Sequence, residues 1–266
     1  DPKAGISIVV SAANRFGDPG KCVTSIGLRT THPSYEIVIL ADEALTVEGR
    51  TYLADCPGRV LQSPSGMAWS GLRNLAVRES DSPYVVFVDG NVEVITDGWL
   101  EALLEYSQHA EIGAVGAKLL SKDGRIRHAG TVLGLGEDGL AGDSLAGFPA
   151  DTGYHFGLAT DVRNCSAVSG SCLMVRRDVF DAVGGFDETV PARFDDLDLC
   201  LRIRQKGFRV VWTPHAQLYQ DLAFSSSRPQ ADEVAFMKSR WGSTLIDDPY
   251  YNPNLTRDRE DFGIRL

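Results

Sequence analysis

The stretch Tyr84–Asn91, with the sequence YVVFVDGN, decides the fold class of this chain. Its first part joins β-branched and aromatic residues without polar alternation, which is typical of a strand covered on both faces of a parallel or mixed α/β sheet. The run then ends abruptly in Asp89, Gly90 and Asn91. Ligands of such sheets bind beyond the carboxyl ends of the strands. The stretch therefore predicts a buried strand with a binding site at Asp89 and Asn91.

Strand and helix patterns alternate before this stretch. The sequence predicts strands at 6–10, 32–41 and 59–62, and helices that start near Lys21 and span 70–80. Such alternation indicates a parallel sheet with right-handed crossovers, since each helix returns the chain to the same edge of the sheet.

The second half combines further strands and helices with a glycine-rich segment. We expect Asp97 to be the N-cap of a helix over 98–110, because its carboxylate can accept from free backbone N–H groups. Residues 121–157 are expected to form a hairpin around the turn KDGR and a long loop at the sheet edge that covers a ligand. The other predicted elements are strands at 112–120, 167–177 and 208–214, the last closing the sheet, and helices at 178–186, 194–207 and 229–242. The fold class is α/β, with a mixed, mostly parallel sheet flanked by helices.

Composition limits the classes of function. The 266 residues could form one large α/β domain or two small ones, and since no repeat or compositional break compels a division, we expect a single domain over 1–266. The formal net charge of -10 argues against a general nucleic-acid binder. No apolar run approaches the roughly 20 residues of a membrane helix, so no transmembrane segment is expected. The five cysteines are widely spaced and lack a CxxC pair, which fits reduced thiols in a cytoplasmic protein.

Three acidic residues, Asp195, Asp196 and Asp198, lie at the start of the helix predicted over 194–207. One interpretation is helix capping and a favourable interaction with the helix dipole, worth about 0.3 to 1 kcal/mol per group. One carboxylate would be enough for that purpose. The other interpretation is a general base that takes a proton from a hydroxyl group. The residues alone leave both open.

Other motifs are weak. GLGEDG at 134–139 fits the dinucleotide pattern G-x-G-x-x-G, but no helix follows it and its two acids would repel a pyrophosphate. No nucleophile elbow is present. The histidines show no metal-ligand spacing, so each is interpreted as structural or as a surface residue.

Several segments together resemble family 2 glycosyltransferases of the GT-A fold, in the group close to bacterial rhamnosyltransferases and polysaccharide-building enzymes. SIVVSAANR is similar to the first-strand signature of that family, and YEIVIL with Ala41 and Asp42 is similar to its nucleotide-binding strand. VFVDGNVEVITDGWLEALL resembles the family's version of the DxD segment. AVSGSCLMVRRDVFDAVGGFDE and FDDLDLCLRIRQKGFRVVWTP resemble the acceptor-side segment and the helix with the catalytic base. The shared order of these segments covers nearly the whole chain.

The resemblance implies transfer of a sugar from a nucleotide-sugar donor to a hydroxyl of a glycan or lipid-linked saccharide, with inversion at the anomeric carbon. Asp196 would be the base, and Asp195 and Asp198 would orient it and the acceptor. The nucleotide-binding half would span about 1–118 and the acceptor-side half about 119–266. The residues implied in donor binding are Ser11, Asn14, Asp42, Arg73, Asn74, Asp89 and Asn91. The chain would act in the cytoplasm or at the inner face of the membrane, with peripheral membrane contact, as part of a longer multidomain protein.

Three departures from the family pattern bear on metal binding and activity. Ala41 replaces an acid expected at the end of the second strand, Asn91 replaces the last acid of the DxD segment, and Gln220 replaces a histidine. Asp89, Asn91 and Gln220 occupy the expected ligand region, but the metal ligands stay unassigned. Neutral carbonyls bind Mg²⁺ or Mn²⁺ weakly, so we expect weak or no dependence on a divalent cation.

Without a metal, arginines or backbone donors must stabilise the leaving diphosphate, and Arg73, Arg125 and Arg193 are candidates. The same departures leave a second hypothesis open, that of a non-catalytic module of this fold that binds a glycan or a partner protein.

Overall fold

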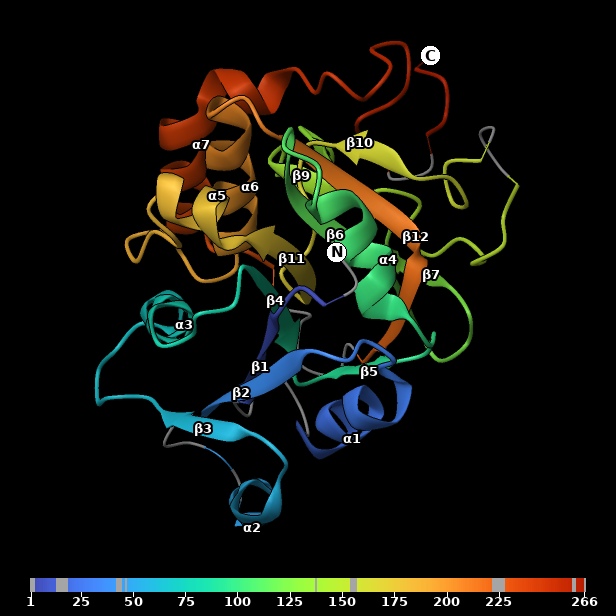
Figure 1. Cartoon of the computed structure of the whole chain (residues 1–266). Helices are drawn as coiled ribbons and strands as arrows, with labels where there is room; N and C mark the ends of the chain where they lie inside the picture. Colours follow the sequence, from blue (N-terminus) through green and yellow to red (C-terminus); the bar gives the residue numbers. More distant parts are fainter. Residues whose placement is uncertain are drawn as a thin grey trace.

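The computed structural model describes residues 3–12, 19–41, 45, 47–136, 138–153, 157–221, 228–259 and 262–265. Ten of the described strands form one mixed sheet in the order β10-β12-β6-β11-β4-β1-β2-β3, with β5 paired to β12 and β7 paired to β6 (Figure 1). Their bounds are β1 Ile6–Ala12, β2 Tyr35–Ala41, β3 Arg59–Gln62, β4 Tyr84–Asp89, β5 Val92–Val94, β6 Ile112–Leu120, β7 Ile126–His128, β10 Arg163–Cys165, β11 Cys172–Arg176 and β12 Arg209–Gln220. A separate hairpin pairs β8 Thr131–Leu133 with β9 Ala141–Asp143.

Seven described helices accompany the sheet. They are α1 Pro19–Arg29, α2 Val47–Asp55, α3 Trp69–Arg78, α4 Trp99–Ser107, α5 Arg177–Ala182, α6 Asp195–Gln205 and α7 Ala231–Ile246. Figure 1 shows α5, α6 and α7 grouped at the opposite end of the molecule from α1 and α2. The predicted α/β fold with a mixed sheet flanked by helices is therefore confirmed.

Strand β4 is the apolar run predicted from the sequence, and it is buried on both faces. Val85 and Phe87 belong to one apolar cluster, whereas Val86 and Val88 belong to the cluster on the other face. This division follows from the period of two in a strand. Burial of a side chain such as Phe87 contributes about 1.5–3 kcal/mol. The strand can therefore lie at the centre of the sheet and bring its polar end to a fixed place.

The direction of the neighbouring strands decides what surrounds that polar end. Strand β1 runs parallel to β4, so its Ser11 lies beside Asp89. Strand β11 runs antiparallel to β4, with Cys172 beside Val88. The loop before β11 therefore arrives at the carboxyl end of β4, where the backbone N–H of Asp89 donates to the carbonyl of Ser171 at 3.2 Å.

Helix α6 fits the predicted boundaries closely. It has three aspartates in its first turn and two arginines in its last turn, which complements the helix dipole. Gly207 follows the helix with a φ of 89°, a left-handed conformation that favours glycine. The residue before the helix, Phe194, provides no side-chain cap. The carboxylates of the first turn bind groups of other elements, and Asp196 also accepts from the N–H of Leu197 in the same turn.

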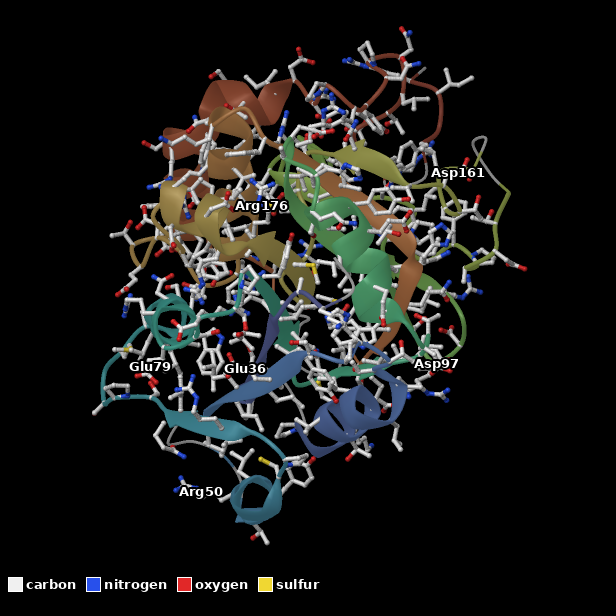
Figure 2. All side chains as sticks on the ribbon, viewed as in Figure 1. Glu36, Arg50, Glu79, Asp97, Asp161 and Arg176 are labelled. Atoms are coloured by element: carbon white, nitrogen blue, oxygen red, sulfur yellow. The ribbon has the colours of Figure 1, made fainter. Side chains whose placement is uncertain are left out.

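Four predictions about the elements were wrong in detail. Asp97 is not the N-cap of α4: Gly98 takes that position with a φ of 70°, and Asp97 pairs with Arg29 at 3.2 Å (Asp97 is labelled in Figure 2). Within residues 121–157, the predicted hairpin around KDGR forms between β6 and β7, but the predicted long loop contains a further hairpin of β8 and β9. The strand predicted over 167–177 begins only at Cys172. Strand β12 continues to Gln220 and does not close the sheet, because β10 pairs with its outer edge.

Within the described residues, every helix is too short or too polar to cross a membrane.

Candidate active site

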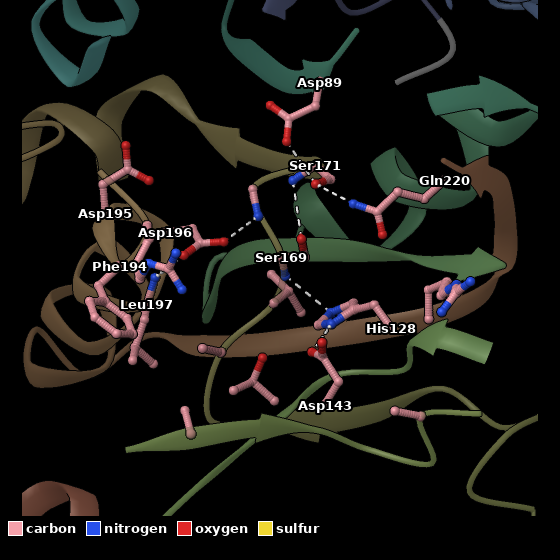
Figure 3. A pocket seen from close by; sticks show the side chains of 18 of the residues that line it. Asp89, His128, Asp143, Ser169, Ser171, Phe194, Asp195, Asp196, Leu197 and Gln220 are labelled. Carbon is pink, nitrogen blue, oxygen red and sulfur yellow. Dashed lines mark hydrogen bonds and ion pairs between the residues drawn. The ribbon is translucent and has the colours of Figure 1, made fainter. Parts of the chain in front are cut away.

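A cavity of about 840 Å³ opens beyond the carboxyl end of β4. Its walls come from the end of β4, the loop 169–171, the first turn of α6, strands β7 and β9, and the end of β12 (Figure 3). The predicted site residues Arg73, Asp89, Asn91, Asp195 and Asp196 all line it. A cavity therefore lies at the end of YVVFVDGN, where the sequence predicts a site.

Arg73 from α3 connects strand β4 with helix α6. Its guanidinium donates to Asp89 at 3.1 Å and to both carboxylate oxygens of Asp195, at 3.1 and 3.2 Å. The side chain is only 4% exposed. Burial acts to lower the pKa of Arg73, but Asp195, Asp89 and Asp196 outweigh it and raise that pKa. Arg73 is therefore a fixed cation whose charge is already shared by two carboxylates.

Asp196 faces the cavity and is held by backbone groups. Its Oδ2 accepts from the N–H of Gly170 at 2.7 Å, and its Oδ1 accepts from the N–H of Leu197 at 2.7 Å. Burial raises the pKa of Asp196, and the nearby charge of Asp89 adds to this, against the hydrogen bonds and Arg73. A carboxylate with a raised pKa at a cavity wall can take a proton from a hydroxyl group.

The loop 169–171 joins the two sides of the cavity. The hydroxyl of Ser171 donates to Asp89 Oδ2 at 2.7 Å and accepts from the amide of Gln220 at 2.9 Å. Figure 3 shows the contacts of Ser171 with Asp89, Gln220 and Ser169. The loop thus contacts both Asp89 and Asp196.

The residues expected to hold a divalent cation do not form a fitting ligand set in the described part of the chain. Both oxygens of Asp89 accept hydrogen bonds, from Arg73 and from Ser171. Gln220 turns its amide nitrogen toward this group. Asn91 donates to the Asp221 carbonyl at 2.9 Å, and its buried Oδ1 has no hydrogen bond to the described residues. The described residues contain no cluster of three or more His, Cys, Asp or Glu suited to a metal.

Asp198, predicted to orient the acceptor, does not line the cavity. Its carboxylate is buried and pairs at 2.7 Å with Arg202 and with Arg240, while Trp241 donates to it at 3.0 Å. These partners attach α6 to α7. The geometry therefore corrects this prediction: Asp198 cross-links two helices instead of reaching an acceptor.

The remaining predicted donor residues lie outside the cavity wall or outside the described residues. Asn74 exchanges hydrogen bonds with the backbone of Phe186, at 2.9 Å each, so its amide supports a turn rather than facing the cavity. Ser11 is buried at the end of β1, and its carbonyl accepts from Gly90 at 2.9 Å. Asn14 and Asp42 lie outside the described residues.

Of the two further arginines considered for the diphosphate, Arg193 lines the cavity. Arg125 does not: it pairs with Asp123 at 3.4 Å and donates to the carbonyl of Gly147 at 2.8 Å. Its guanidinium supports the turn between β6 and β7.

Sequence reasoning missed His128 and Asp143, which line the cavity on the side opposite β4. His128 was interpreted as structural or as a surface residue because it belongs to no metal-binding spacing. The available signal was its place between the turn KDGR and Gly130, next to Ile126 and Arg127. That pattern is too common to indicate a site.

Comparison with known proteins gives a family and a fold. A family model described as "Glycosyltransferase like family 2" matches residues 2–244. The uncharacterized protein y4gI of Sinorhizobium fredii is 38% identical over 97% of this chain and 30% of its own length. The O-antigen biosynthesis protein RfbC of Myxococcus xanthus is 31% identical over 98% of this chain and 21% of its length. An N-acetylglucosaminyl-diphospho-decaprenol L-rhamnosyltransferase of Mycobacterium tuberculosis is 32% identical over 52% of this chain and 47% of its length. The chain thus spans less than a third of the first two relatives.

Two solved structures share the fold. GalNAc-T7, crystallised with UDP, GalNAc and Mn²⁺, superimposes with a TM-score of 0.68 at 14% identity, over 92% of this chain and 49% of that one. The mannosyltransferase PcManGT from Pyrobaculum calidifontis, in complex with GDP-Man and Mn²⁺, gives a TM-score of 0.59 at 15% identity, over 93% and 66%. At such low identity these likenesses establish the GT-A fold alone.

Proposed function

The chain belongs to glycosyltransferase family 2, and from this premise we propose that it is an inverting enzyme. It moves a sugar from a nucleotide-sugar donor to a hydroxyl of a glycan or lipid-linked saccharide. The observation that carries this proposal is Asp196, a carboxylate at the cavity wall with backbone N–H groups on both oxygens. The relative named for O-antigen biosynthesis supports a polysaccharide-building role.

The chemistry follows from one displacement. Asp196 takes the proton of the acceptor hydroxyl, whose oxygen attacks the anomeric carbon while the bond to the diphosphate breaks. The nucleoside diphosphate leaves on the opposite face, so the configuration inverts. Such base catalysis contributes roughly 10²–10⁴-fold to a rate. Asp195, held by Arg73, fixes the first turn of α6 and with it the direction of Asp196.

We propose that the donor lies against the end of β4, with weak or no metal dependence. The engagement of both Asp89 oxygens by Arg73 and Ser171 supports this. Because Arg73 already compensates Asp89 and Asp195, it cannot offset the charge of a diphosphate alone. Arg127 and Arg193 also line the cavity and would add positive charge there, although Arg193 already pairs with Glu233 at 3.6 Å.

The two halves of the chain meet at this cavity, which supports the proposed division into a donor-side half over about 1–118 and an acceptor-side half over about 119–266. Arg73 and Asp89 come from the first, His128 and Asp196 from the second. The free cysteines fit action in the reducing cytoplasm, at the inner face of the membrane where the acceptor is lipid-linked.

One experiment tests the proposal directly. UDP, dTDP and GDP are titrated with and without Mn²⁺, with thermal stability and hydrolysis of the corresponding nucleotide sugars as the two readouts. We expect one nucleotide to raise the melting temperature and its sugar to be hydrolysed, with little change on adding Mn²⁺. If no nucleotide binds, the enzymatic proposal fails.

The competing proposal is a non-catalytic module that binds a glycan or a partner protein. The ion pairs of Arg73 with Asp89 and Asp195 favour it, because they occupy the donor side of the cavity with internal contacts. Binding of a saccharide without binding of any nucleotide would support this alternative.

A further inference from the structure

His128 in β7 and Asp143 in β9 form a hydrogen-bonded pair on the cavity wall, and the proposed reaction gives neither residue a role. His128 is only 2% exposed, and its Nδ1 lies 2.7 Å from a carboxylate oxygen of Asp143. Its other ring nitrogen, Nε2, accepts from the backbone N–H groups of Ser169 at 3.1 Å and Gly130 at 3.2 Å. Every polar atom of this imidazole is therefore engaged.

These contacts fix the tautomer of the ring. Backbone N–H groups can only donate, so Nε2 must be the unprotonated acceptor. The proton of the neutral ring then lies on Nδ1 and is donated to Asp143. Asp143 thus selects the tautomer that can hold the two backbone groups.

The loop held by His128 is the one that holds the proposed base. Ser169, fixed by His128, precedes Gly170, whose N–H donates to Asp196 at 2.7 Å. A β-carbon on Gly170 would lie 3.1 Å from the Cβ of Asp196, so this part of the loop is already in close contact with the base. A shift of the backbone at Ser169 is therefore transmitted to the carboxylate of Asp196.

From this geometry we infer that His128 and Asp143 are positioning residues for the base Asp196, acting through the backbone of the loop 169–171. The inference rests on the proposed function, since it assumes that Asp196 is the base. The pair does not touch the reacting atoms in this role. It sets the place of the Gly170 N–H, and displacement of a catalytic group by about 1 Å is enough to cost on the order of 10²-fold in rate.

The test compares two substitutions of His128 with a matched control. His128→Ala removes the acceptor, whereas His128→Gln offers a side-chain oxygen at a similar distance from the backbone. His32→Ala is the control, because His32 is also 2% exposed and hydrogen-bonded to a backbone carbonyl, that of Ala4 at 2.8 Å, but lies away from the cavity. All variants are first compared by melting temperature, so that a general loss of folding is detected.

The first readout is structural and does not depend on activity. In the wild type, the nitrogen NMR spectrum of His128 should show protonated Nδ1 and unprotonated Nε2, and the Gly170 amide should exchange slowly. We expect His128→Ala to speed exchange at Gly170 by about tenfold or more, His128→Gln to restore most of the protection, and His32→Ala to leave it unchanged. The opposite tautomer, or unchanged exchange in His128→Ala, would overturn the inference even if the enzyme is active.

The second readout separates turnover from binding. With UDP, dTDP and GDP as probes and their sugars as hydrolysis substrates, His128→Ala should lower the turnover number by about tenfold or more, with the affinity for the nucleotide unchanged. Asp143→Ala should have a smaller effect in the same direction, and Asp143→Asn, which keeps an acceptor oxygen, should recover it. An equal loss of nucleotide affinity would contradict a positioning role. Failure of the wild type to bind any nucleotide would instead contradict the proposed function.

Discussion

Two carboxylates face the same cavity, but different groups hold them. At the end of β4, Asp89 is bound by the side chains of Arg73 and Ser171, which engage both of its oxygens. At the start of α6, Asp196 is bound by the backbone of Gly170 and Leu197. A buried cation neutralises the first carboxylate, whereas only backbone dipoles and a more distant charge stabilise the second. The second carboxylate is therefore the one left without a direct cationic partner, as the proposed base would require, while the first belongs to a fixed network of side chains.

The sharpest test of this difference is Asp196→Asn. The amide keeps the shape of the carboxylate but cannot take a proton, so turnover of the nucleotide sugar should fall by about 10²–10⁴-fold. Nucleotide affinity should stay nearly unchanged, because the donor side of the cavity is intact. Steady-state hydrolysis and nucleotide titration measure the two quantities. A large loss of affinity would show that Asp196 binds the donor instead of acting as the base.

Arg73→Met tests the carboxylate at the end of β4, because it removes the cation that pairs with Asp89. It leaves Asp89 and Asp195 as buried carboxylates without their cation, and loss of one partner of a buried ion pair costs about 3–5 kcal/mol of the free energy of unfolding. Urea denaturation measures this loss. Arg59→Met is the control, because its pair with Glu79 is about two-fifths exposed and should contribute at most about 1 kcal/mol. Equal losses in the two variants would contradict a structural role for the Arg73 pairs.

The pH dependence of hydrolysis and of the free energy of unfolding should reveal the protonation of Asp196. Burial raises the pKa of Asp196, with Asp89 adding to the effect and Arg73 opposing it, and Asp195 also lies beside it. Hydrolysis should therefore fall on acidification at a higher pH than an ordinary aspartate would give. The free energy of unfolding should change in the opposite direction, decreasing as the pH rises. A raised pKa in the folded state favours the protonated form, so the contribution of Asp196 to the free energy of unfolding is present at low pH and is lost as the pH rises through the folded pKa.

The check is to measure the free energy of unfolding of the wild type and of Asp196→Asn from acidic to neutral pH. The free energy of unfolding of the asparagine variant should rise relative to that of the wild type as neutral pH is approached. A difference that is constant with pH would mean that the pKa of Asp196 is not raised in the folded protein.

Gly170→Ala should have the smallest effect of the four predictions. Its new methyl group would lie 3.1 Å from Cβ and 3.3 Å from Oδ2 of Asp196, so the carboxylate must move by a few tenths of an ångström. We expect turnover to fall several-fold, up to about tenfold, without loss of nucleotide affinity. Gly242→Ala in α7 is the control, since a methyl group there meets no atom within 4 Å. A turnover equal to that of the control would show that the loop does not constrain the base.

Local sequence pattern was sufficient to predict the fold and several residues that line the cavity at the end of β4. The apolar run of β4, the period of the helices and the acidic start of α6 are each readable over a few residues, because one period specifies which side chains are buried together. The capping of α4 was not readable, since Asp97 has the residue type of a cap but pairs with Arg29, while Gly98 takes the cap position.

The α/β fold, the polar end of β4 and the acidic start of α6 follow from the sequence alone. The partners that each of these carboxylates binds depend on the tertiary structure. Asp195 and Asp198 lie one turn apart on α6, yet Arg73 from α3 binds the first, and Arg240 and Trp241 from α7 bind the second. The contact of His128 with Ser169 likewise joins residues far apart in the chain. Helical and strand periods specify which face a residue occupies, but the partner on that face is set by how distant elements pack.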